Sequence, residues 1–225
     1  MPYLSAEEHV RVSAAVAAAE DRTSGEIVTI VADRSDGYSD VTLAWAALAA
    51  FLVLALLPLL AGPLLEALDP LHGGWNVAWE APGIFVVAAI AGILTFLIVL
   101  GVQALIPALR FALIPGRIKT ERAEDRAIDL FKVGAERRTQ GRTGILIYLS
   151  MREHRAEIVA DEAITALVPP ETWGEAMGAM LAELKQGRIA EGMIAAVERV
   201  GAVLAEHFPR AENDRNELPD RLIEL

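Results

Sequence analysis

Two groups of polar residues in this chain have the types and spacing that could do chemistry. Asp33, Asp36 and Asp40 lie within eight positions, and Glu153 is followed directly by His154. Carboxylate oxygens are the ligands that Mg²⁺ and Ca²⁺ prefer, and a glutamate or histidine can transfer a proton during a reaction. The three aspartates are therefore candidate metal ligands, and the candidate catalytic residues of a metal-assisted hydrolase are Asp36, Asp40, Glu153 and His154.

Each of these residues also has a structural interpretation. Asp36 precedes a glycine in a dipeptide that favours turns, and Asp40 can cap the apolar helix that follows it. Glu153 and His154 can be solvated residues of a turn. The sequence has no Walker loop, GxSxG elbow or HExxH motif, and its four histidines lack metal-ligand spacing. A divalent cation, Mg²⁺ or Ca²⁺, is thus an option, and no motif requires a cofactor.

The residues that follow Asp40 are apolar enough to enter a membrane. Residues 43–65 carry no charge, and neither do residues 84–109. At about 1.5 Å per helical residue, each span can cross a hydrocarbon core of roughly 30 Å. The alternative is a buried hairpin in a soluble protein, but such helices are usually shorter and keep a polar stripe. We expect a transmembrane helical hairpin over residues 41–110, with a kink or an early helix end at Pro58, Gly62 and Pro63.

The basic residues predict how this hairpin is oriented. They follow the second span closely, whereas the connection over residues 66–83 has no Lys or Arg. Basic residues concentrate on the cytoplasmic side, so both termini are expected in the cytoplasm. The net charge of −11 argues against nucleic acid as a partner, because phosphates require a basic face. The lipid bilayer is the expected partner of the membrane-surface residues, which are Arg110, Arg117, Lys119 and Arg122.

Outside the hairpin, the sequence predicts a small layered α/β/α domain. Ser5 and Glu8 have capping-box spacing at the start of a helix that runs to about Arg22. Strands are expected over residues 26–32, 143–150 and 156–160, and helices over residues 120–138, 169–187 and 189–208. A strand, a crossover helix and a second strand form parallel neighbours, so residues 1–40 and 111–225 should build a mixed sheet of at least three strands. We expect a fourth edge strand in a segment that reads as loop, and a tail that is loose or docked through Leu222 and Ile223.

The hairpin interrupts the connection that leaves the carboxyl end of the first strand. This end, the turn after the second strand and the start of the first helix should share one sheet edge, where open α/β sheets bind ligands. Asp161 and Glu162 follow the third strand and should lie at the opposite edge. The residues that could converge in a crevice near the lipid headgroups are Asp33, Asp36, Tyr38, Asp40, Ser150, Glu153 and His154, with Glu7, Glu8 and His9 beside them.

Four segments outside the spans read "SGEIVTIVADRSDGYSD", "RTGILIYLSMREHRAEIVAD", "GRIAEGMIAAVERVGAVLAEHFP" and "NELPDRLIEL". Together they resemble the TPM domain family, in the bacterial branch whose members carry a membrane hairpin inside the domain. The resemblance implies an α/β sandwich in a multi-pass protein of the bacterial inner membrane. Chloroplast members are described as acid phosphatases linked to photosystem repair, some family domains bind calcium, and one animal member is a receptor accessory protein, so the implied function is mixed.

Two functions are therefore expected. The first is a non-enzymatic module that docks on other membrane proteins and supports their assembly, quality control or repair, because the anchored, acidic domain lacks a specific catalytic signature. The second is a phosphatase-like hydrolase of phosphate esters near the membrane surface, for which the family resemblance is the reason.

Overall fold

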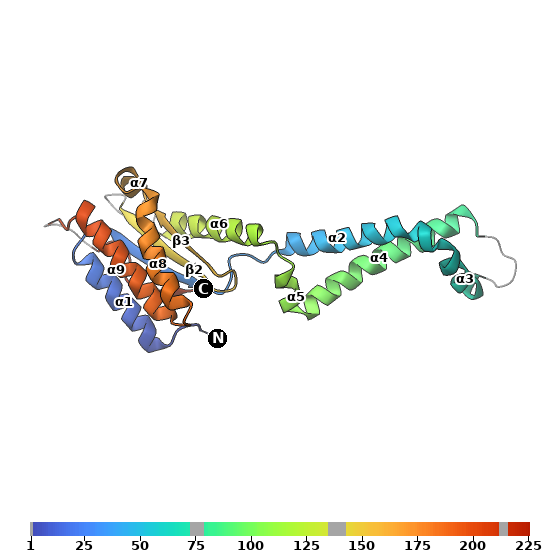
Figure 1. Ribbon diagram of the computed structural model, residues 1–225, viewed down its shortest axis with the longest axis horizontal. Helices are drawn as coiled ribbons and strands as arrows, with labels where there is room; N and C mark the ends of the chain where they lie inside the picture. Colours follow the sequence, from blue (N-terminus) through green and yellow to red (C-terminus); the bar gives the residue numbers. More distant parts are fainter. Residues whose placement is uncertain (1, 73–78, 135–142, 212–215) are drawn as a thin grey trace. The chain divides into compact units, whose positions relative to one another are not determined.

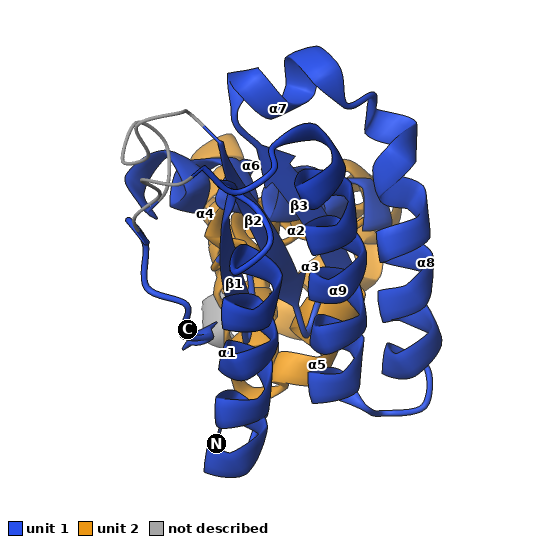
Figure 2. Cartoon of the chain, turned by 90° about the vertical axis from the view of Figure 1, so that its left-hand side faces the viewer, with its two compact units in different colours: residues 1–36, 116–225 blue, residues 37–115 orange. Residues whose placement is uncertain are grey.

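The computed structural model describes residues 2–72, 79–134, 143–211 and 216–225. It divides the chain into two compact units, coloured separately in Figure 2. Unit 1 comprises Met1–Asp36 and Gly116–Leu225, and unit 2 comprises Gly37–Pro115. An α/β unit is thus interrupted once, by a helical unit.

Unit 1 contains a four-stranded mixed sheet in the order β3-β2-β1-β4. β2 and β4 run parallel to β1, and β3 runs antiparallel to β2. The strands are β1 (Glu26–Ala32), β2 (Gly144–Ser150), β3 (Arg155–Ala160) and β4 (Ile223–Glu224). The predicted α/β class, the parallel pairing of the first two strands and the mixed sheet are confirmed. The fourth strand lies in the tail, where Leu222 is buried.

Helices cover both faces of this sheet (Figure 1). The helices of unit 1 are α1 (Ala6–Glu20), α6 (Gly116–Gly134), α7 (Glu162–Leu167), α8 (Trp173–Leu184) and α9 (Ile189–His207), with a 3-10 turn η2 (Pro170–Thr172) before α8. α1, α8 and α9 share one core with the sheet, in which Val16, Met180 and Val200 are fully buried. α6 packs on the other face through Ala127 and Phe131. Because both faces are covered, β1 and β2 are buried throughout, which explains their largely apolar sequences.

A capping box fixes the start of α1, and small residues determine how closely α1 packs on α9. Ser5 is the N-cap residue, and it forms the predicted capping box with Glu8. At the other end of α1, Ala19 lies against Gly201 of α9, where an added Cβ would approach the Ala19 Cβ to 2.6 Å. Two small residues therefore allow α1 and α9 to pack closely. α7 was not predicted, because its six residues are too few to show a helical period.

Unit 2 consists of helices with apolar, exposed surfaces. They are α2 (Ser39–Leu56), a 3-10 turn η1 (Leu57–Leu60), α3 (Ala61–His72), α4 (Ala81–Leu105) and α5 (Pro107–Ala112). α2 and α4 pack side by side, with Gly92 against Leu54 (Figure 1). The η1 turn stands where the prolines predicted a kink. Ser39–Pro70 and Ala81–Leu105 are long and apolar enough to cross a membrane, judged by length and composition, and this suggests membrane association.

Candidate functional site at the carboxyl ends of the parallel strands

A buried chain of hydroxyl and carboxylate groups lies at the carboxyl ends of β1 and β2. Glu153 is 3% exposed, and its carboxylate accepts hydrogen bonds from the Ser150 hydroxyl and, at 3.3 Å, from the Ser35 backbone N–H. The Ser35 hydroxyl lies 2.9 Å from Ser150 Oγ and 3.0 Å from the Tyr148 hydroxyl. Burial raises the pKa of Tyr148 above its ordinary value. The network ties the segment after β1 to the β2–β3 turn.

A second, more exposed group surrounds Asp33 at the same sheet edge. The Tyr3 hydroxyl donates to the Asp33 carboxylate, and Arg152 Nε lies 3.1 Å from Asp33 Oδ2. The hydrogen bond from Tyr3, and then Arg152, lower the pKa of Asp33, whereas the same hydrogen bond raises the pKa of Tyr3. Both oxygens of Asp33 therefore face donors from the same chain.

The chain ends also meet at this edge. Glu224 of β4 accepts a hydrogen bond from the Tyr3 backbone N–H, and its Oε2 lies 2.9 Å from His9 Nε2. The start of α1 thus lies where it was expected, held by a residue of the C-terminal strand. Asp161 lies at the opposite edge, as expected, where its side chain accepts from the Gly144 N–H at 3.3 Å.

Several predicted site residues are placed apart from these two groups. Asp36 pairs with Arg122 of α6 at 3.3 Å, and both side chains are partly exposed. His154 has φ 52°, a turn conformation, and its exposed ring Nδ1 lies 3.2 Å from the Arg152 carbonyl oxygen. Tyr38 and Asp40 belong to unit 2. There Tyr38 is the N-cap residue of α2, and Asp40 lies in the first turn, where a carboxylate meets the positive end of the helix dipole.

The basic residues predicted at the membrane surface also divide between the two units. In unit 2, Arg110 donates to the Gly37 carbonyl and, through Nε, to Thr42 Oγ1 at 3.0 Å, near the start of α2. In unit 1, Arg117 pairs with Glu121 at 2.8 Å, and Lys119 and Arg122 follow on the same helix. Arg110 thus forms hydrogen bonds within unit 2, whereas the Arg117 side chain is largely exposed.

These placements do not suit a divalent cation. Within the described ranges, no group of three or more His, Asp or Glu side chains is gathered in a way that could hold a metal ion. Asp33 faces Arg152 and Asp36 faces Arg122, so a cation at either carboxylate would meet a guanidinium group. The side chains that do share the edge form internal hydrogen bonds, and their arrangement can hold three segments of chain together.

Comparison with known proteins shows similarity to a family and to a solved structure. Residues 108–203 match the family model of the TPM domain. The match covers less than half of the chain. Its fold is similar to the NMR structure of BA42 protein from the psychrophilic bacterium Bizionia argentinensis, with a TM-score of 0.57 and 19% sequence identity over 100% of this chain and 97% of that chain. No curated protein matches this chain.

A polar cluster at the other end of β1 was not predicted. Both carboxylate oxygens of Glu26 accept backbone N–H groups, from Glu217 and Leu218, at 3.1 Å each. Glu20 Oε1 accepts the Ile27 N–H at 2.7 Å, and Asp220 lies close enough to influence its charge. These carboxylates attach the C-terminal segment to the sheet of unit 1. The signal in the sequence was a charged residue, Glu26, at the start of a largely apolar strand.

Three residues of the candidate site itself were also overlooked. Tyr3, Ser35 and Glu224 complete the two groups at the carboxyl ends of the parallel strands of unit 1. Ser35 lies inside the aspartate-rich segment, between Asp33 and Asp36, so its position was a usable signal. Tyr3 and Glu224 are 221 residues apart in sequence, and no local pattern connects them.

Proposed function

We propose that this protein is a membrane-anchored TPM-domain module that docks on other membrane proteins and supports their assembly or quality control. The proposal rests on the contacts that the carboxylates make at the carboxyl ends of the parallel strands. Asp33, Asp36 and Glu153 each accept hydrogen bonds or ion pairs from the same chain, so they stabilise the domain and present no assembled reaction centre.

The exposed apolar helices support the anchoring part of this proposal. Only 6% of the most apolar window in each candidate span is buried inside unit 2. Leu52, Phe85 and Ile98 are among the large apolar side chains left exposed, and water would solvate them at a high free-energy cost. A bilayer removes that cost. Lipid is therefore the proposed surrounding of unit 2.

The distribution of basic residues supports an orientation with both termini in the cytoplasm of a bacterial inner membrane. Arg117, Lys119 and Arg122 follow the second span and can contact anionic lipid phosphates, whereas residues 66–83 carry no Lys or Arg. This orientation makes unit 1 available to the cytoplasmic segments of neighbouring membrane proteins.

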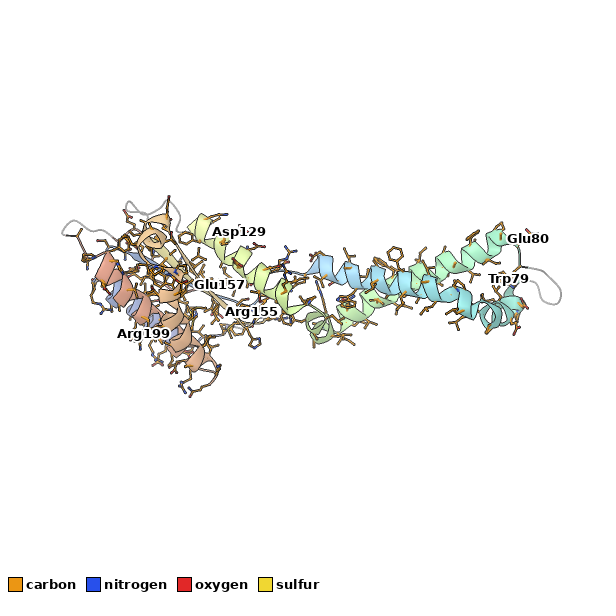
Figure 3. All side chains as sticks on the ribbon, turned by 45° about the horizontal axis from the view of Figure 1, so that its top comes forward. Trp79, Glu80, Asp129, Arg155, Glu157 and Arg199 are labelled. Carbon is orange, nitrogen blue, oxygen red and sulfur yellow. The ribbon has the colours of Figure 1, made fainter. Side chains whose placement is uncertain are left out.

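Single cysteines test the orientation directly, because the natural chain has none. Glu80→Cys and Asp129→Cys introduce thiols at two exposed positions that are labelled in Figure 3. We expect an impermeant maleimide to label the Glu80→Cys variant in intact cells, and the Asp129→Cys variant after the membrane is opened. Labelling of both thiols, or of the Asp129 variant alone, in intact cells would contradict the proposed topology.

Site-specific crosslinking in native membranes tests the docking role. A photo-crosslinking amino acid at Asp129 or at Arg199 of α9, both in unit 1, should capture the same membrane protein in independent preparations (Figure 3). Phe51 of α2, which is 69% exposed, is the control position and should capture mainly lipid. Absence of a recurring protein from the unit 1 positions would count against docking.

The second candidate is a phosphatase-like hydrolase that uses Mg²⁺ or Ca²⁺. The observation in its favour is that Asp36 and His154 are accessible near the same sheet edge, although Arg122 occupies one side of Asp36. Turnover of a generic phosphate ester that requires a divalent metal, and that Asp36→Asn abolishes without unfolding the protein, would favour this candidate over the docking module.

A further inference from the structure

The outer strand β3 leaves one edge of the sheet without a neighbour among the described residues. β2, β1 and β4 follow β3 on one side only. All six residues of β3 are partly exposed, whereas all seven residues of β1 and of β2 are buried. β4, at the other edge, is two residues long. β3 is therefore the longer of the two outer strands.

The hydrogen-bond register shows which backbone groups of β3 point away from the sheet. The Asp161 N–H donates to the Gly144 carbonyl at 2.9 Å, which places this pair in the narrow, bonded class of an antiparallel ladder. Because bonded and non-bonded pairs alternate along the ladder, the backbone N–H and C=O groups of Arg155, Glu157 and Val159 point toward β2. The backbone groups of Ala156, Ile158 and Ala160 point outward, and within the described chain they form no other backbone hydrogen bond.

The side chains of β3 give this edge two different faces. Glu157 and Val159 lie on the face that α6 covers, and Arg155 Nε donates to Thr120 Oγ1 of α6 at 2.8 Å. Figure 3 shows Glu157 beside α6. On the opposite face, Ala156, Ile158 and Ala160 border the apolar core beneath α8 and α9. One face of β3 therefore has an acidic side chain at its centre, and the other face carries apolar side chains, two of which are small.

Arg155 only partly offsets two effects that disfavour the charged form of Glu157. Burial, and then the neighbouring Glu124, raise the pKa of its carboxyl group above the ordinary value. A cation placed on the open side of Glu157 would relieve both effects. In an added strand, the side chain directly opposite Glu157 lies about 5 Å away, within reach of a Lys or Arg.

We propose that β3 accepts an extended segment of a partner membrane protein as a fifth strand, with a basic residue of that segment opposite Glu157 and apolar residues over Ile158. Backbone hydrogen bonds would provide affinity, and the two side-chain faces would provide selectivity. Cytoplasmic segments of membrane proteins are rich in Lys and Arg, which matches this requirement. The inference rests on the proposed docking function and specifies how docking occurs.

Synthetic peptides provide a defined probe. The parent peptide has eight residues of alternating Val and Thr, with one central Thr replaced by Arg, and two matched peptides carry Gln or Glu at that position. Binding to the full-length protein in nanodiscs is measured by fluorescence anisotropy. We expect the Arg peptide to bind about fivefold more tightly than the Glu peptide, because opposite charges across a ladder attract and like charges repel.

Two variants locate the binding site. With Glu157→Gln, the Arg and Glu peptides should bind about equally tightly. Glu175→Gln, at an exposed position of α8, is the control and should leave the preference for the Arg peptide unchanged. Ile158→Pro removes an outward N–H without removing a bond to β2, and should abolish binding. Hydrogen exchange gives an independent readout, since the peptide should protect the amides of Ala156, Ile158 and Ala160.

The outcomes separate this inference from the docking function. Failure of all three peptides to bind, or equal binding by the Arg and Glu peptides, would overturn the inference. In that case the charges of β3 would serve to prevent strand pairing between copies of the protein. If crosslinking at Asp129 or Arg199 still captured a recurring membrane protein, docking would stand and would use another surface. If crosslinking failed as well, both would fall.

Discussion

The carboxyl group of Glu20 predicts an unusual dependence of stability on pH. It lies at the end of α1, where its Oε1 accepts the Ile27 N–H at 2.7 Å and its buried Oε2 has no donor within the described residues. The pKa of Glu20 is raised to about 8, chiefly by burial; the hydrogen bond from Ile27 opposes the rise, and the carboxylates of Glu26 and Asp220 add to it. At neutral pH, the Glu20 carboxyl group is therefore mostly protonated.

The sign and size of the effect follow from proton binding. The folded protein keeps the Glu20 proton up to a pKa of about 8, whereas the unfolded chain loses it near 4.5. The stabilisation is complete below pH 4.5 and is lost as the pH rises through about 8, so the free energy of unfolding must fall across this window. At about 1.4 kcal/mol per pKa unit the ceiling is near 5 kcal/mol. Water reaches the exposed part of the side chain, so we expect a loss of about 2–3 kcal/mol.

Urea unfolding of the full-length protein in detergent measures this loss between about pH 5 and pH 9. Fluorescence of the buried Trp173 reports on unit 1 once the other three tryptophans are replaced by phenylalanine. Glu20→Gln mimics the protonated form, so its stability should change little with pH and should exceed that of the parent by about 2–3 kcal/mol at the alkaline end. Glu171→Gln, at an exposed position, should behave like the parent. A parent stability that is constant or rises over this range would refute the reasoning.

Two further predictions concern packing and the buried network. Gly201→Ala should destabilise unit 1 by about 1–3 kcal/mol, because its Cβ would overlap Ala19, whereas Gly178→Ala, which meets no atom within 4 Å, should gain up to about 1 kcal/mol in urea unfolding. Equal effects of the two substitutions would contradict the close contact. Ser150→Ala removes a donor to the buried Glu153 and should cost about 1–3 kcal/mol in the same assay, so a change below roughly 0.5 kcal/mol would show that the bond is dispensable.

The sequence predicts the layers of unit 1 well because their patterns are strong and local. The bounds of β1 agree with the prediction, since its apolar run is preceded by Gly25 and followed by polar residues. α6 begins at Gly116, four residues before the expected start, because a helix can extend into polar residues without changing its periodic face. β4 pairs through Ile30 and Val31 over only two residues, and such a short strand has no period to detect.

The candidate site is less predictable, because its partners come from distant parts of the chain. Topology correctly brings Ser150 and His9 to the edge at which β1 ends. It does not reveal that Ser150 binds Glu153, that Tyr3 and Arg152 both bind Asp33, or that His9 meets Glu224. Donor–acceptor pairing depends on side-chain positions within about an ångström, and residue order alone does not fix these.

The ion pair between Asp36 and Arg122 suggests how one α/β unit tolerates a helical insertion. Asp36 is the last residue of unit 1 before the insertion, and Arg122 lies in the α6 helix that resumes unit 1 after it. The pair at 3.3 Å, together with the parallel register of β1 and β2, joins the two parts of unit 1 across the interruption. Loop-closure entropy grows only slowly with length, so 79 intervening residues add little to the cost that a short crossover loop would carry. The core of unit 1 is thus specified by residues on both sides of the insertion, and none of its described core residues comes from unit 2.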